Sequence, residues 1–145
     1  MAGPLNSIVV ATDASDSSNR AVDFAIAIAN SENAALCIVT VAMPISSSAR
    51  REFERVEGAG ADPSEAAAQL ILTEAGERAG QTGTTPEMVL LRGDPAEAII
   101  SAIANKKPDA IVVGRRGRGQ LAGLLLGSVS QKLAMLSSCL VVIVP

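Results

Sequence analysis

Apolar residues along this chain gather into short runs that are separated by polar turns and by stretches with helical periodicity. Runs with the length and composition of buried strands occupy Ser7–Thr12, Ala35–Met43, Glu87–Arg92, Ala110–Val113 and Cys139–Val144. After the first run, Val22, Ile26 and Ala29 recur at the three- and four-residue spacing of one helix face. The pattern therefore predicts a helix over Arg20–Asn30 between two buried strands.

Two later helices share one start signature. Asp62 and Asp94 are each followed by proline, and a glutamate stands three residues after each aspartate. Aspartate is a favoured N-cap, proline fits the first helical position, and a glutamate at the third can reach back to the cap. Helices are therefore predicted over Pro63–Ala79, Pro95–Asn105 and, after a serine-rich start, Ser128–Leu136.

The segment 45–61 shows the weakest pattern, with a serine run, alternating charges and a tail of glycine and alanine. It is expected to be a solvated surface segment. A short helix, a mobile loop and a lid over a ligand are the structures it could form.

Strands and helices alternate along the chain, which ends on a strand. This alternation requires right-handed crossovers, and these produce a parallel sheet with helices on both faces. With 145 residues, the chain has the length of one domain. The sequence therefore predicts a single three-layer α/β/α domain, residues 1–145, around a five-stranded, doubly wound sheet. Ligands of such sheets bind beyond the carboxyl ends of the strands, where the winding reverses.

Composition excludes several functional classes. The net charge of -3 and the two phenylalanines as sole aromatic residues argue against nucleic acid, which needs clustered positive charge and stacking platforms. The lack of histidine removes Ser-His-Asp and Cys-His nucleophiles and every histidine-containing metal site. Cys37 and Cys139 lie in apolar runs and are expected to be buried and reduced.

A cytosolic location without membrane attachment is expected. The first residues lack the basic start and long apolar stretch of a signal peptide. No apolar run approaches the ~18 residues of a membrane span.

The most distinctive segment is Gly114–Ser128, directly after an apolar run. Its glycines allow backbone N–H groups to approach an anion, and the helix that opens at Ser128 has an N-terminus that favours phosphate. The spacing is glycine, two residues, glycine, nine residues, glycine, serine. With this spacing, Asp13 after the first strand and the closing V-V-I-V-P, the chain resembles the ATP-binding branch of the universal stress protein family over nearly its whole length.

The resemblance implies a Rossmann-like sheet of the adenine nucleotide alpha hydrolase type, in the order 3-2-1-4-5, with strands one and four side by side at a crevice. It implies that this crevice holds ATP, ADP or AMP. The nucleotide-binding residues would be Thr12, Asp13 and Val41 at or just after the ends of the first two strands, Val113 at the end of the fourth strand, Gly114, Arg116, Gly117 and Arg118 in the turn that follows it, and Gly127, Ser128, Val129 and Ser130 at the next helix start.

Several of these residues have simpler alternatives. Asp13 could cap the first helix; if it instead faces a triphosphate, Mg²⁺ or Mn²⁺ must lie between the two negative groups. Ser128 and Ser130 either donate to phosphate or serve as caps. The arginines of the glycine-rich segment, Arg115, Arg116 and Arg118, either screen phosphate or are solvated loop charges. Its leucines, Leu121, Leu124, Leu125 and Leu126, are expected to pack against the domain or a partner.

Three functions are compatible with these residues. The favoured one is a small cytosolic ATP-binding regulatory or stress-response protein with, at most, slow hydrolysis. An ATPase or nucleotidyl transferase is the second, although no Walker motif and no catalytic base can be identified. The third is a dimeric interaction module with no bound nucleotide.

A homodimer is expected through the last strand, Cys139–Val144. The strand is apolar on both faces, yet it would lie at the edge of the sheet, where unpaired backbone groups are normally covered. Two-fold pairing of this strand from two copies would close the edge. Family members often carry proline where Leu140 stands, which leaves the register of the pairing open.

Overall fold

The computed structural model describes residues 4–117 and 126–145. Within them, five strands form one parallel sheet in the order β3-β2-β1-β4-β5, which confirms the expected topology. The strands are β1 (Ser7–Ala11), β2 (Ala35–Ala42), β3 (Glu87–Arg92), β4 (Ala110–Gly114) and β5 (Leu140–Val144). The winding reverses between β1 and β4, so the carboxyl ends of these two neighbours mark the expected ligand crevice.

Four of the described helices form the outer layers of the sandwich. Helices α1 (Asp16–Glu32) and α3 (Pro63–Gly80) pack on one face of the sheet, and α4 (Pro95–Lys106) and α5 (Ser128–Leu136) pack on the other. The first face buries Ile8, Val10, Ile38 and Val112, and the second buries Val9, Val39, Ile111 and Val113. Because side chains alternate across a strand, the continuous apolar runs of the sequence supply both faces at once.

Small side chains bring α1 close to the sheet. Ala21, Ala25 and Ala29 recur every four residues on one side of this helix, and all three are buried. The described core is filled by alanine and branched aliphatic residues, as expected for a chain with two aromatic residues.

The helix-start signature is confirmed in part. Asp62 and Asp94 are N-caps whose carboxylates accept backbone N–H groups, and each is followed by proline in the first turn. Glu65, however, contacts Arg92 at 2.5 Å. Helix α1 begins earlier than predicted because Ser15 caps it, so that Ser17 and Ser18 lie in its first turn and not in a preceding loop.

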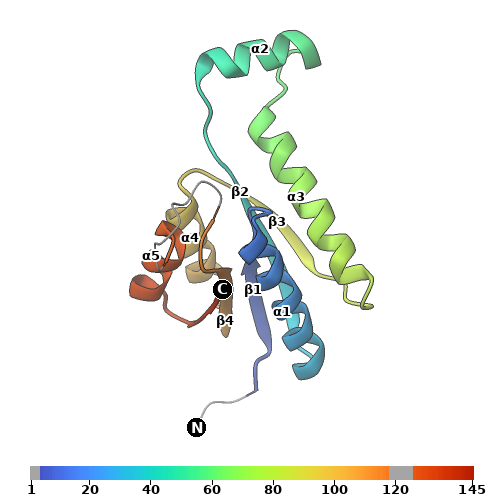
Figure 1. Cartoon of the computed structure of the whole chain (residues 1–145), viewed down its shortest axis with the longest axis vertical. Coiled ribbons are helices and arrows are strands. Elements are labelled where there is room, and N and C mark those ends of the chain that lie inside the picture. The colour runs from blue at the N-terminus through green and yellow to red at the C-terminus, as the bar shows by residue number, and fades with distance from the viewer. Residues whose placement is uncertain (1–3, 118–125) are drawn as a thin grey trace.

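The segment 45–61 contains a helix, α2 (Ser47–Glu57), in which no residue is buried. Figure 1 shows α2 beyond the carboxyl ends of the strands, separate from the two helical layers. The prediction of a solvated surface segment is therefore correct, and the short helix is the form it takes.

The two cysteines differ. Cys37 is buried in β2, and this burial raises the pKa of its thiol to about 11, which keeps it protonated and poorly nucleophilic. Cys139 is only partly buried, so the expectation that both would be buried is wrong for this residue. It precedes the edge strand β5, where less structure covers it. Within the described chain, no helix has the length and apolar character needed to span a membrane.

Candidate functional site

A cavity of about 210 Å³ opens at the carboxyl ends of β1 and β4, where the winding of the sheet reverses. Its lining comes from the ends of β1, β2 and β4, the turns that follow them, and the starts of α4 and α5. The residues are Ala11, Thr12, Asp13, Ser15, Ser18, Thr40, Val41, Met43, Pro95, Ile99, Val113, Gly114, Arg116, Gly117, Gly127, Ser128, Val129 and Ser130. Every residue predicted for the site lines this cavity except Arg118, which lies outside the described residues.

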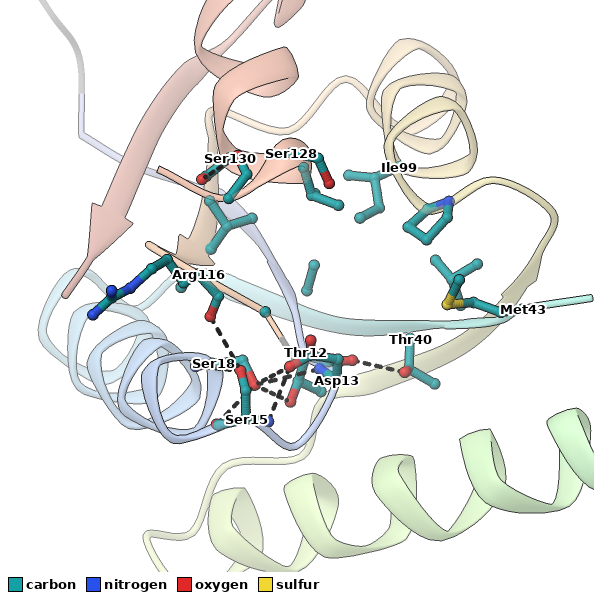
Figure 2. Close-up of a pocket in the computed structure, with 18 residues that line it drawn as sticks. Thr12, Asp13, Ser15, Ser18, Thr40, Met43, Ile99, Arg116, Ser128 and Ser130 are labelled. Atoms are coloured by element: carbon teal, nitrogen blue, oxygen red, sulfur yellow. Dashed lines mark hydrogen bonds between the residues drawn. The ribbon is translucent and has the colours of Figure 1, made fainter. Parts of the chain in front are cut away.

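The turn after β1 is held by a dense set of hydrogen bonds (Figure 2). The Oδ1 atom of Asp13 accepts from the Ser15 N–H and from the Ser18 hydroxyl, both at 2.9 Å. The backbone N–H of Ala14 donates to Thr12 Oγ1 at 3.2 Å, and Ala14 itself has a positive φ of 64°. That conformation is costly for a residue with a Cβ, and the surrounding hydrogen bonds maintain it.

Asp13 is therefore not the N-cap of α1. Ser15 is the N-cap, and its side chain accepts the N–H of Ser18. The Asp13 carboxylate instead orders the turn and directs the cap residue, while its Oδ2 side approaches Gly117 from the other loop. A Cβ on Gly117 would lie 2.6 Å from that oxygen, so a larger residue at this position would require the Asp13 carboxylate to move.

Gly114, at the end of β4, allows the second loop to pack directly on the first turn of α1. A Cβ at Gly114 would lie 2.5 Å from Ser17 Oγ and 2.7 Å from the backbone nitrogen of Ser18. Ser17 then fixes the approach, because its hydroxyl donates to the carbonyl of Arg116. The loops after β1 and β4 are thus held together by direct contact across the switch point.

The start of α5 provides the third side of the polar end. Its N-cap is Gly127, which has no side-chain oxygen to offer, so no side chain caps the first turn of this helix. The carbonyl of Arg115 accepts from the Gly127 N–H at 2.7 Å and from the Ser130 hydroxyl at 2.8 Å. Ser130 is therefore buried and bonded to the backbone, and both it and the exposed Ser128 line the cavity.

The arginines are arranged differently from one another. The backbone of Arg116 lines the cavity, but its guanidinium points away from it (Figure 2). The backbone N–H of Arg115 donates to the carbonyl of Val144 in β5 at 2.7 Å, and its side-chain Nε is buried. Arg115 is therefore not among the residues that line the cavity, and the Arg116 side chain is not directed into it. Leu121, Leu124 and Leu125 of the same segment also lie outside the described residues.

The opposite end of the cavity is apolar. Val41 and Met43 come from the end of β2, and Pro95 and Ile99 come from the start of α4. Figure 2 shows Met43 and Ile99 on the side away from the hydrogen-bonded serines of the first turn. Sequence reasoning identified Val41 but missed the other three, although the start signature of α4 follows the carboxyl end of β3 and so indicated this edge of the sheet.

The described residues hold no group of three or more cysteine, aspartate or glutamate side chains that could enclose a metal ion. Asp13 is the only carboxylate in the described lining of the cavity. The donor set therefore fits a cation carried by the phosphates of a ligand, with water and at most one protein carboxylate completing its shell.

An apolar slot next to the start of α5, at the switch point of a doubly wound parallel sheet, lies where α/β proteins of this architecture bind their ligands. The sequence profile of the universal stress protein family matches residues 4–145, and the chain belongs to this family.

Individual relatives are similar over most of their length. Universal stress protein YxiE of Bacillus subtilis is 34% identical over 145 residues, covering 96% of this chain and 98% of the relative. Universal stress protein Rv1636 of Mycobacterium tuberculosis is 38% identical over 129 residues, covering 84% of each.

Solved structures agree with the fold. A universal stress protein crystallised in complex with cAMP is 39% identical, with a TM-score of 0.71 over 99% of both chains. The universal stress protein UspA from Lactobacillus plantarum has a TM-score of 0.82 over 99% of this chain and 100% of its own, at 18% identity, and this likeness concerns the fold alone.

The close packing at Gly114 generates the first prediction. Gly114→Ala should lower the free energy of unfolding by about 1–3 kcal/mol, because the added methyl group meets the backbone of α1. Chemical denaturation followed by circular dichroism measures this change. Gly80→Ala is the matched control, since no atom lies within 4 Å of its added Cβ and its stability should not fall. Equal stabilities of the two variants would contradict the packing argument.

Proposed function

We propose that this protein binds an adenine nucleotide, with ATP as the favoured ligand and ADP or AMP as alternatives, and acts as a regulatory protein of the stress response. The observation that carries the proposal is the two-ended cavity: an apolar slot bounded by Val41, Met43 and Ile99 faces a polar end built from Thr12, Asp13 and the uncapped start of α5. A planar base fits the first end, and phosphates fit the second.

The relatives support the same ligand class. The structure in complex with cAMP comes from a protein that is 39% identical to this chain. Two other universal stress proteins of similar fold, from Archaeoglobus fulgidus and Arabidopsis thaliana, were solved with dAMP and with AMP. All three ligands carry an adenine base and a phosphate, which match the apolar slot and the polar end of the cavity.

A binding role is favoured over rapid catalysis. Among the described residues that line the cavity, Asp13 and Arg116 are the charged ones, and the Arg116 guanidinium points away. Oδ1 of Asp13 already accepts two hydrogen bonds that order its own turn. In this proposal the nucleotide is a signal or a structural ligand in the cytoplasm, and hydrolysis is slow compared with the ~10 s⁻¹ typical of enzymes.

The last strand supports a homodimer. Strand β5 is the final strand of the described sheet, Leu140 is 56% exposed on it, and Met135 and Leu136 at the end of α5 are exposed as well. An apolar edge of this kind is normally covered, and pairing of β5 with its copy would cover it.

The site assignment is tested at Gly127. A Cβ there would lie 3.2 Å from Cα of Arg116 and 3.4 Å from the backbone nitrogen of Gly117, so a larger side chain pushes the start of α5 away from the loop after β4. Gly127→Val should abolish nucleotide binding in a protein that remains folded, as measured by titration with a fluorescent ATP analogue and by circular dichroism. Gly80→Val, at an open helix end, should bind normally. Normal binding by folded Gly127→Val would refute the assignment.

The proposed role of the cation is tested by chelation. If Mg²⁺ or Mn²⁺ bridges Asp13 and the phosphates, EDTA should weaken the binding of ATP much more than that of adenosine. Asp13→Asn should remove most of this difference, because the amide oxygen preserves an acceptor for Ser15 and Ser18 but carries no charge. Isothermal titration calorimetry gives the affinities. If EDTA weakens the binding of ATP and of adenosine equally, the proposed cation bridge is wrong and Asp13 only orders its own turn.

The proposed dimer is tested at its edge. Leu140→Lys places a charge on the outer strand and should convert the dimer to a monomer in size-exclusion chromatography with light scattering. Leu70→Lys on α3, which is 68% exposed at a different surface, should remain dimeric. A wild-type protein that stays monomeric at high micromolar concentration would overturn the proposal.

A further inference from the structure

Helix α2 is the one described helix that has no place in the two layers. It is amphipathic: Ala49, Phe53 and Val56 follow the i, i+4, i+7 spacing of one helix face, and the other positions are mostly charged or serine. Such a stripe is ordinarily buried against a neighbour. Here Val56 is 68% exposed, Phe53 is only partly buried, and no residue of α2 is buried.

The position of α2 relates it to the nucleotide crevice. Figure 1 shows the helix beyond the carboxyl ends of the strands, which is the end at which the cavity opens. Its first tether starts at Met43, which lines the cavity and is 57% exposed, and ends at the cap Ser46. This tether spans at most about 14 Å when extended, so α2 cannot move far from the mouth of the cavity.

The second tether contains the backbone features of a hinge. Gly58 and Gly60, with φ of 108° and 83°, separate the end of α2 from Asp62, the N-cap of α3. No atom lies within 4 Å of the Cβ position of either glycine, so this connection is not packed against the domain. Together with residues 43–46, which belong to no helix or strand, it allows α2 to rotate as a unit.

One ion pair links α2 to α3 in the described chain. Nη2 of Arg50 lies 3.0 Å from Oδ2 of Asp62, and Arg50 is half exposed. Hydrogen bonds from Ser64, together with Arg50, hold the pKa of the Asp62 carboxyl below its usual value, so this residue is ionised at neutral pH. An exposed pair of this kind contributes little stability and can be broken by a modest competing interaction.

We propose that α2 is a lid of the nucleotide site, an inference that rests on the proposed function. When a nucleotide fills the cavity, α2 rotates about its two tethers. This rotation places Phe53 and Val56 over the base, next to Met43 at the apolar end of the cavity. The cavity volume of about 210 Å³ is below the ~300 Å³ at which sites begin to enclose a small ligand, so a bound nucleotide would project from the mouth and offer the stripe an apolar surface.

The movement is measured with a single fluorophore. The chain contains no tryptophan or tyrosine, so the Phe53→Trp variant reports on α2 alone. Adding ATP should shift the emission to shorter wavelength and reduce quenching by acrylamide. Both changes should saturate at the concentration at which calorimetry shows the site to be filled. Leu70→Trp, on the exposed side of α3, is the matched control and should not respond.

The possible outcomes distinguish a failure of the lid proposal from a failure of the proposed nucleotide binding. If calorimetry shows ATP binding and the emission of the Phe53→Trp variant does not respond, the lid is wrong and the nucleotide site stands. If calorimetry shows no nucleotide binding by the wild-type protein, the proposed function fails. If the indole of the Phe53→Trp variant becomes shielded with rising protein concentration in the absence of ATP, the stripe covers a second copy of the chain and the lid is wrong.

Affinity provides an independent measurement. Asp62→Asn keeps a capping oxygen but loses the charge that holds Arg50, so closure becomes easier and ATP should bind up to about five-fold more tightly. Glu65→Gln, in the same turn of α3 but paired with Arg92, should leave the affinity unchanged. Phe53→Ser should weaken ATP binding roughly ten-fold through the loss of apolar cover. Unchanged affinity in both Asp62→Asn and Phe53→Ser would overturn the proposal.

Discussion

The site depends on the close contact between the end of β4 and the first turn of α1. Gly114 leaves no space for a side chain against Ser17 and Ser18, and the Ser17 hydroxyl donates to the carbonyl of Arg116. This contact fixes the loop after β4 against the turn after β1 at the switch point of the sheet. Without it, two of the three sides of the polar end would lose their mutual support, because both are loops.

The same contact explains why glycine and serine are frequent at the polar end of the site. Close approach requires glycine and serine, which bring no long side chains, and the uncapped N-terminus of α5 supplies donors in place of lysine. Backbone N–H groups bind phosphate through fixed dipoles, and they introduce no catalytic base. This is the physical basis for proposing that the protein retains a nucleotide and does not turn it over rapidly.

Two parts of the described molecule are incompletely covered, and both are apolar. The edge of β5 exposes Leu140, and α2 exposes the stripe that includes Val56. In each case no other strand or helix of the described sheet and its two helical layers covers these apolar side chains. A strand edge is covered by another strand, whereas an apolar helix stripe is covered by an apolar surface. We therefore propose different contacts for the two features: a copy of the chain for β5 and the occupied crevice for α2.

The sequence by itself determined the order of elements, the parallel topology and the segments that form the site, because apolar periodicity and glycine spacing are local signals. Tertiary structure alone decided which groups those segments present. Asp13 orders its own turn while Ser15 caps α1, Ser130 is turned into the backbone, and the Arg116 side chain leaves the cavity. Met43, Pro95 and Ile99 joined the site only through the packing of β2 and α4. These side-chain orientations depend on contacts between residues far apart in the chain, and the spacing of residues along the sequence does not specify such contacts.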